Sequence, residues 1–248
     1  MKRKTVAFFD LDNTLIKGAA LYHLGKGLIR YNLIRKAEIR IFARAQFKFR
    51  ATSKEPKLTS LVDKALALLS GRDREKIENA TLKIVDEFLP LAIHQGALEL
   101  LRVAKEQYDD VWILSAAPDQ LVKIIAKKLN LTGGVGTMLE VKDGLYTGKI
   151  LGDFHHGQSK SKTVEKLSKE NGYDLKKSAT FSDSFNDLPL LESCGLANAV
   201  NPDRKLRKHA KRKFWPIRDI NNRYRNFYRI ALLLYTLLTI ELTLKIFG

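Results

Sequence analysis

The residues from Phe8 to Leu15 read FFDLDNTL, and this stretch decides the fold. Val6–Phe9 is a short apolar run typical of a buried strand, and it delivers Asp10 and Asp12 to the C-terminal end of that strand. Open α/β sheets place their binding sites at this end of the strands. A carboxylate there can attack phosphorus, and a second one can act as general acid and base. The alternative is an Asp-rich turn that merely caps a helix.

Three further segments supply matching chemistry. Val111–Ser115 is a second apolar strand, and it ends in a hydroxyl. Lys160 stands at the start of an amphipathic helix, and Lys162 in the same helix is a second candidate for a phosphate-binding lysine. Ala179–Asp187 is another strand that ends in clustered acids. A lysine and a serine can bind phosphoryl oxygens, while carboxylates hold a hard cation such as Mg²⁺.

In this order, the four segments resemble the haloacid dehalogenase superfamily of phosphohydrolases, and most closely its phosphoserine-phosphatase-like subclass IB. The resemblance covers roughly Lys4 to Ile217, and it includes a hairpin at Leu139–Gly148 and the stretch Ala199–Arg204. It implies a Mg²⁺-dependent phosphomonoester hydrolase that acts through an aspartyl-phosphate intermediate. The enzyme class implied is therefore a phosphatase.

The resemblance also implies roles for individual positions. Asp10 would be the nucleophile and a metal ligand. Asp12 would be the general acid and base and would also give its backbone carbonyl to the metal, and Asp183 would complete the metal set. The two phosphate-binding and the two supporting positions would be Ser115 and Lys160, and Asn186 and Asp187.

The sequence departs from phosphoserine phosphatases where they recognise the amino acid. Those enzymes carry a glutamate for the substrate amine shortly after the first motif, but this chain reads IKGAA at Ile16–Ala20. The nearest counterpart of their cap arginine is Lys64, and Ala116 stands where they usually have glycine. The phosphate chemistry is retained without the amino-acid recognition set, so phosphoserine is not the expected substrate.

The expected fold class is α/β, with a doubly wound, mostly parallel Rossmann-like sheet. A helical cap is inserted after the first strand, and an apolar helix ends the chain. The predicted core spans 1–15 and 92–220, the cap spans 16–91, and the membrane-associating segment spans 221–248. Gly133–Gly136 is expected to lead into a further strand.

Several polar or reactive residues are assigned no chemistry. Cys194 is the only cysteine, which excludes an internal disulfide and fits a reducing compartment. His155 and His156 are expected on a surface loop, because no cysteine or histidine stands at zinc-ligand spacing from them. The N-terminus mimics a secretory start, but Asp10 interrupts its apolar run, so no signal peptide is expected.

Two segments hold the net charge. Lys26–Lys57 contains ten Lys or Arg against two Asp or Glu, and Asp203–Arg229 contains eleven against two. These excesses of +8 and +9 equal the whole formal net charge of +17, so the remaining chain is balanced. An anionic partner is therefore expected, either a membrane surface or nucleic acid.

The C-terminus favours the membrane over nucleic acid. Ile230–Phe247 is apolar apart from Glu241 and Lys245, with Thr residues between. As a helix it would run roughly 27 Å, close to the thickness of a bilayer's hydrocarbon core. Arg and aromatic residues precede it, as a cytoplasmic membrane interface favours. Whether such a helix spans the bilayer, lies on it, or packs on the cap or on a dimer partner stays open.

The prediction is therefore a cytoplasmic catalytic domain attached to the inner face of the cell membrane. Its substrate would be a lipid-linked or small organic phosphate, and Leu21–Phe49 of the cap would also lie on anionic lipid or simply form a solvated cap face. One alternative is a phosphatase that is merely tethered to the membrane and acts on a soluble, phosphoserine-like metabolite. Another is a non-catalytic protein that binds membrane or an anionic polymer, although such a protein would be expected to have lost an acidic position. No nucleic-acid partner is expected, because the basic tail leads into an apolar helix rather than a recognition motif.

Overall fold

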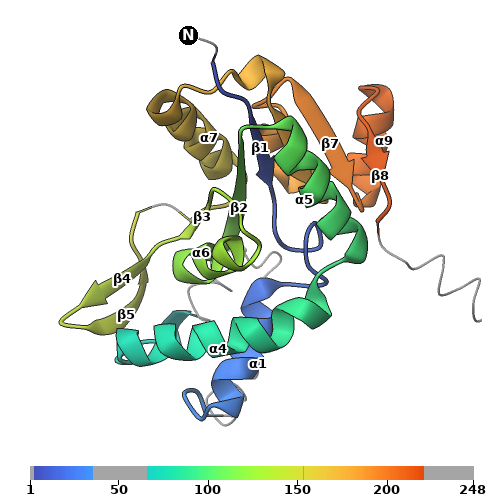
Figure 1. Cartoon of the computed structure of the whole chain (residues 1–248). Helices are drawn as coiled ribbons and strands as arrows, with labels where there is room; N and C mark the ends of the chain where they lie inside the picture. Colours follow the sequence, from blue (N-terminus) through green and yellow to red (C-terminus); the bar gives the residue numbers. More distant parts are fainter. Residues whose placement is uncertain (1–2, 36–65, 153, 221–248) are drawn as a thin grey trace, which may run out of the picture.

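A six-stranded parallel sheet carries the structure, which is a computed structural model that describes residues 3–35, 66–152 and 154–220 (Figure 1). The strand order is β3-β2-β1-β6-β7-β8, and every neighbouring pair is parallel. The strands are β1 Val6–Phe9, β2 Asp110–Pro118, β3 Gly133–Thr137, β6 Ala179–Ser182, β7 Leu196–Val200 and β8 Ile217–Arg218.

Helices cover both faces of the sheet. They are α1 Ala20–Arg30, α4 Arg74–Ala92, α5 Gln95–Gln107, α6 Asp119–Lys128, α7 Gln158–Asn171, α8 Leu188–Leu191 and α9 Arg204–Arg212, with single 3₁₀ turns at Leu175–Lys177 and Phe185–Asp187. In β1, Ala7 and Phe9 pack in the cluster that contains α5 and α6, whereas Val6 and Phe8 pack in the cluster that contains α7 and α8. Because both faces are covered, β1 is buried along its whole length, which explains its continuous apolar sequence.

A helix pair and a hairpin lie beyond the C-terminal end of β1 (Figure 1). Helices α1 and α4 pack closely, since the backbone of Gly27 meets the side chain of Ile84. The hairpin pairs β4 Leu139–Lys142 with β5 Leu145–Ile150 in antiparallel fashion. Asp143 and Gly144 form its turn with φ angles of 50° and 77°, as a two-residue Asp-Gly hairpin loop requires.

The predicted doubly wound parallel sheet is confirmed, with two differences in detail. Strand β2 continues past Ser115 to Pro118, and its pairing with β3 shifts register between Leu114 and Pro118. Gly133–Gly136 leads into strand β4 as predicted, but it also forms most of a strand itself, β3. Its glycines allow close packing, because a Cβ on Gly136 would lie 2.4 Å from the carbonyl oxygen of Ala117.

Other predictions fall outside the described residues or stay predictions. Lys64, the part of the predicted lipid-facing stretch Leu21–Phe49 that follows residue 35, and the whole segment 221–248 lie outside the described residues. Within the part of the chain that the structure describes, no helix combines the length and the apolar character needed to cross a bilayer. The division into a core and a cap at residues 15 and 91 remains a prediction.

Replacing Gly136 by alanine should destabilise the fold. The new Cβ would meet backbone atoms of Ala117 and Asp119 at 2.4 to 2.9 Å, and backbone cannot move aside as a flexible side chain does. We expect the free energy of unfolding, measured by urea titration, to fall by at least about 1–3 kcal/mol. Gly25→Ala is the matched control, because nothing lies within 4 Å of its Cβ position in α1. It should stabilise by about 0.5–1 kcal/mol, and equal effects of the two changes would contradict this account of β3.

Candidate active site

Asp10 lies directly after the central strand β1. Its backbone N–H donates to the carbonyl oxygen of Phe181 at 2.9 Å, which continues the pairing of β1 with β6 by one residue. The hydroxyl of Thr14 donates to Asp10 Oδ2 at 3.2 Å, and the side chain of Asp10 is almost fully buried. The first motif therefore bends back on itself so that Thr14 holds the carboxylate that the strand presents.

Lys160 reaches Asp10 from the first turn of α7. Its Nζ donates to Asp10 Oδ1 at 2.6 Å and to Asp187 Oδ2 at 2.8 Å. All three side chains are buried, so this is an ion-paired triad that is shielded from most of the solvent. Lys162 is exposed on the outer face of the same helix. Of the two candidate lysines, the structure brings Lys160 to the acids.

The loop after β6 brings its acids to the same place. The hydroxyl of Ser182 donates to Asp187 Oδ2 at 2.8 Å, so Asp187 accepts from both Ser182 and Lys160. The backbone of Asp183 is held by the N–H of Asp203, which donates to its carbonyl oxygen at 2.8 Å. Asn186 is exposed, and its N–H donates to the hydroxyl of Ser184 at 3.2 Å. Asn186 therefore belongs to the turn rather than to the buried cluster.

Asp12 faces the start of the helix pair. Its Oδ1 accepts a hydrogen bond from the backbone N–H of Ala20 at 2.8 Å, where α1 begins. The alternative interpretation, in which the Asp-rich turn caps a helix, is therefore correct in part, because Asp12 accepts a hydrogen bond from the first N–H of α1. Burial is the main cause that raises the pKa of Asp12 above its ordinary value, while the bond from Ala20 opposes the shift. A carboxyl group with a raised pKa is better suited to act as a proton donor near neutral pH.

Ser115 is buried near the end of β2, where His155 holds its backbone. Ser115 Oγ accepts from the N–H of Ala117 at 3.1 Å. Nδ1 of His155 lies 3.1 Å from the carbonyl oxygen of Ser115, and its Nε2 lies 2.8 Å from Thr163 Oγ1 on α7. Because a carbonyl only accepts, Nδ1 carries the proton. Burial lowers the pKa of His155 to about 4, so this ring is neutral at physiological pH.

The prediction that His155 and His156 lie on a surface loop is wrong for His155. Only 5% of the His155 residue is exposed, and His156 is half-buried. The physical reason is that the ring of His155 joins β2 to α7, since it bonds Ser115 and Thr163. No local pattern signals these partners, because Ser115 stands forty positions away in the chain.

Negative charge exceeds positive charge in this cluster. Burial raises the pKa of Asp10 to about 8; Lys160 opposes the shift, and the charges of Asp187, Asp183 and Asp12 add to it. Burial and the charge of Asp187 raise the pKa of Asp183 to about 7. Burial alone would lower the pKa of Lys160, but Asp10 and Asp187 together raise it. One lysine therefore faces four carboxyl groups that lie within electrostatic range of one another.

The residues at this position fit a magnesium ion. The surplus carboxylates are hard oxygen donors, and their raised pKa values show that a further positive charge would stabilise them. Among the described residues no three His, Cys, Asp or Glu side chains converge as a metal cage. The set implied by the family resemblance contains two side-chain carboxylates, from Asp10 and Asp183, and the backbone carbonyl of Asp12. Mg²⁺ typically takes one or two carboxylates and keeps several waters.

Similar proteins point to one family. The family model of haloacid dehalogenase-like hydrolases matches residues 7–192. Phosphoserine phosphatase SerB1 of Mycobacterium tuberculosis is 37% identical over 86% of this chain and 70% of its own. A histidinol-phosphatase of Neisseria meningitidis is 29% identical over 86% of this chain and 98% of its own. A Bordetella pertussis protein of unknown function has a solved structure with a TM-score of 0.78 and 24% identity, covering 89% of this chain and 100% of its own.

Magnesium should stabilise the protein more strongly at high pH than at low pH. Without metal, folding raises the pKa of Asp183 to about 7, whereas an unfolded carboxyl loses its proton near pH 4. The unfolded state therefore binds fewer protons between these values, and stability falls as pH rises from about 4 to about 7. Mg²⁺ competes with those protons, so its shift of the melting temperature should be larger at pH 8.5 than at pH 6.

The matched control for this measurement is Asp183→Asn, which should remove most of the magnesium-induced shift at both pH values. At a magnesium concentration of 100 Kd the stabilisation should approach about 2.7 kcal/mol in the unaltered protein. A shift that is equal at both pH values, or larger at pH 6, would contradict the assignment of these carboxylates to the ion.

Proposed function

The chain belongs to the haloacid dehalogenase-like hydrolases and is a phosphatase of that family; on this premise we propose that it hydrolyses phosphomonoesters with Mg²⁺ through an aspartyl-phosphate at Asp10. The observation that carries the proposal is the buried contact of Lys160 with Asp10 and Asp187 at the C-terminal ends of the central strands. This arrangement holds the Asp10 carboxylate and the Lys160 ammonium group next to each other, as a phosphoryl-transfer site requires.

The proposed reaction begins with attack by a carboxylate oxygen of Asp10 on phosphorus. The oxygen–phosphorus bond forms as the bond from phosphorus to the alcohol oxygen breaks, and Asp12 protonates the departing alcohol. Asp12 then takes a proton from the water that attacks the aspartyl-phosphate, which releases inorganic phosphate and restores Asp10. Lys160 and Ser115 would hold the oxygens of the phosphoryl group. Mg²⁺ bound by Asp10, Asp183 and the Asp12 carbonyl would offset negative charge on those oxygens.

The substrate proposed is a lipid-linked or small organic phosphate at a membrane surface. The two relatives above carry the names of phosphatases for two different compounds, so family membership alone does not choose one. The amino-acid recognition residues of phosphoserine phosphatases have no clear counterpart at Ile16–Ala20. A soluble metabolite phosphatase that is tethered to the membrane is the second candidate, favoured by the phosphoserine phosphatase name of the relative from Mycobacterium tuberculosis.

A basic surface on α9 supports the membrane part of this proposal. We call it the α9 surface, and it consists of exposed cations and one exposed ring: Arg204, Lys205, Lys208, Lys211, Arg212, Lys213 and Phe214. Leu206 and Ala210 anchor the opposite face of the helix in a small core cluster, so the cations must face outward. Among the described residues none of these six cations has an acidic partner, whereas the nearby Arg207 pairs with Asp219.

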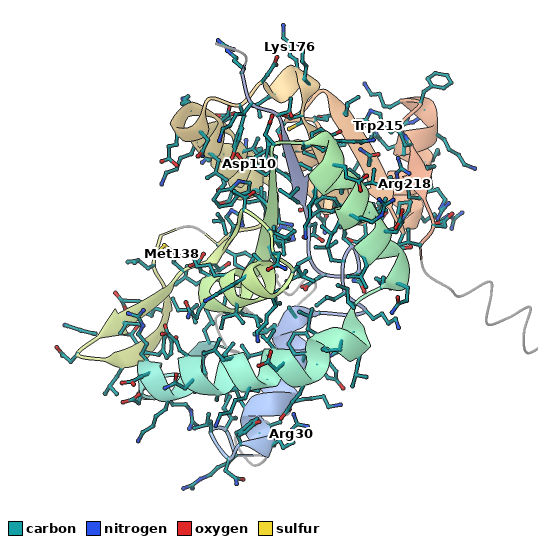
Figure 2. All side chains as sticks on the ribbon, in the orientation of Figure 1. Arg30, Asp110, Met138, Lys176, Trp215 and Arg218 are labelled. Atoms are coloured by element: carbon teal, nitrogen blue, oxygen red, sulfur yellow. The ribbon has the colours of Figure 1, made fainter. Side chains whose placement is uncertain are left out.

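Phe214 distinguishes this surface from an ordinary solvated helix. It is 93% exposed and has a φ of 56°, a left-handed conformation that bulky residues rarely adopt. Trp215 and Arg218 lie on the same side of the molecule as α9 (Figure 2). Cations around an exposed aromatic ring suit the headgroup region of an anionic bilayer, where the ring enters the interface and the cations stay in water. The cytoplasmic leaflet carries such charge, so the proposed location is its surface.

The nucleophile is tested by Asp10→Asn. We expect kcat on a generic aryl phosphate to fall by about 10⁴-fold or more, because an amide cannot form the acyl phosphate. The fold should survive, since the amide oxygen of the isosteric asparagine can still accept the hydrogen bond from Lys160 and Asp187 still pairs with that lysine. Asp143→Asn in the exposed hairpin turn is the matched control and should keep full activity, because asparagine also accepts its positive φ. Undiminished turnover in Asp10→Asn would refute the mechanism.

The α9 surface is tested by changing Lys205, Lys208 and Arg212 to glutamine in the full chain. Each cation near an anionic surface contributes about 1 kcal/mol, so binding to phosphatidylglycerol vesicles should weaken by about 100-fold in co-sedimentation. Changing the exposed lysines of α7, namely Lys162, Lys166 and Lys169, is the matched control and should leave binding unchanged. Equal losses in the two triple variants would show that only net charge matters and would remove the α9 surface from the proposal. Salt-sensitive binding to DNA that exceeds binding to vesicles would favour nucleic acid instead.

A further inference from the structure

A cavity of about 260 Å³ lies beside Asp12, between the start of α1, the end of β2 and the hairpin. Asp12 is the proposed proton donor to the departing alcohol. The carbon part of that alcohol, which is attached to the oxygen that Asp12 protonates, would therefore lie in this cavity. The wall residues are mostly apolar: Ala19, Leu21, Leu66, Ala116, Ala117, Pro118, Leu139 and Phe154, with Asp12, Thr137 and His156.

The polar groups of this wall are largely satisfied by the protein itself. The hydroxyl of Thr137 donates to the carbonyl oxygen of Ala116 at 2.9 Å and accepts from the N–H of His155 at 3.2 Å. One oxygen of Asp12 is taken by the N–H of Ala20. No lysine, arginine or glutamate of the described residues lines the cavity. A carboxylate inside it would therefore lose its water without gaining a cation from the described wall, and an ammonium group would find only Asp12, the proposed proton donor.

Flat rings form one side of the cavity. Phe154 and His156 stack with their ring centroids 5.7 Å apart and an interplanar angle of 13°. Burial is the main cause that lowers the pKa of His156 from its ordinary value, so the imidazole offers a neutral surface near pH 7. Leu21 and Leu139, from α1 and β4, complete an apolar lining. This lining suits aliphatic or aromatic carbon.

We propose that this cavity binds the leaving group of the substrate and selects phosphomonoesters whose alcohol is small, uncharged and apolar. This inference rests on the proposed function, because the role of Asp12 places the alcohol here. Its volume is just below the range of about 300–1,000 Å³ typical of sites for drug-sized ligands, so the group that enters corresponds to a short alkyl chain or a single ring. Amino-acid phosphates, which carry an ammonium and a carboxylate, are disfavoured.

The test compares kcat/KM of the full chain with Mg²⁺ on methyl phosphate, n-butyl phosphate and O-phospho-L-serine. Even one added methylene in an apolar pocket typically improves discrimination by about 10-fold or more, so n-butyl phosphate should exceed methyl phosphate at least about 10-fold. It should exceed O-phospho-L-serine by on the order of 100-fold, since the carboxylate of serine finds no cation on the described wall.

A pair of variants in the hairpin ties the preference to this cavity. Leu139→Arg places a cation on the wall and should lower the ratio of kcat/KM for n-butyl phosphate over O-phospho-L-serine at least about 10-fold. Leu145→Arg adds the same charge to the same hairpin at a position that is 41% exposed and outside the cavity, and it should leave the ratio unchanged. Circular dichroism confirms that each variant is folded, and the comparison on the unaltered chain does not depend on either variant.

The possible outcomes separate this inference from the function on which it rests. A preference for O-phospho-L-serine over n-butyl phosphate would overturn the inference and leave the phosphatase mechanism intact. Equal activity on all three compounds would also overturn it, because the cavity would then select nothing. Failure to hydrolyse any of them above the level of Asp10→Asn would overturn both proposals.

Discussion

The buried ion pair between Lys160 and Asp10 is the constraint on which the rest of the structure depends. A lysine in the interior is tolerated only when its charge is paired and its donors are satisfied. Asp10 and Asp187 meet that demand from two different strand ends, at 2.6 and 2.8 Å. The position of α7 over the sheet is thereby fixed relative to both β1 and β6. Replacing either acid by a residue without a hydrogen-bond acceptor would leave the ammonium group with an incomplete set of partners, so the pair makes folding and the geometry of the site depend on each other.

The carboxyl groups of this cluster outnumber its one lysine, and this excess of negative charge bears on the proposed function. Burial and mutual repulsion raise the pKa of Asp10 and Asp183 well above their ordinary values. A phosphomonoester would add further negative charge to this site, and Lys160 alone cannot offset it. Stability and the proposed function therefore pull in opposite directions here, since a divalent cation would offset the charge repulsion that destabilises the metal-free protein. Such conflicts concentrate at functional sites, where an otherwise unfavourable charge arrangement is retained.

The sequence predicts the site where local patterns and sheet topology act together. Asp10 and Ser115 each follow an apolar run, Asp183 follows the predicted strand at Ala179–Ser182, and parallel strands bring such positions to one edge, so their proximity follows from pattern and topology. The burial of His155 was not predicted because its partner Ser115 lies forty positions away, and a loop histidine carries no periodic signal. The role of Gly136 in β3 was not predicted, for a different reason. This glycine allows the close approach of its backbone to the backbone at Ala117, which no propensity scale records.

The two ends of the proposed substrate meet different kinds of structure. The phosphate end is built by residues at strand ends and in the first turn of α7, which the rigid parallel sheet holds in place. The leaving-group end is built by α1, the hairpin and the loop that carries Phe154 and His156. Loops and inserted elements tolerate change far better than central strands do. Substitutions can therefore change the cavity wall while the proposed catalytic residues are kept. This accounts physically for relatives that are named for different phosphate compounds. Specificity in this chain should accordingly be sought in the apolar wall and not in the carboxylates.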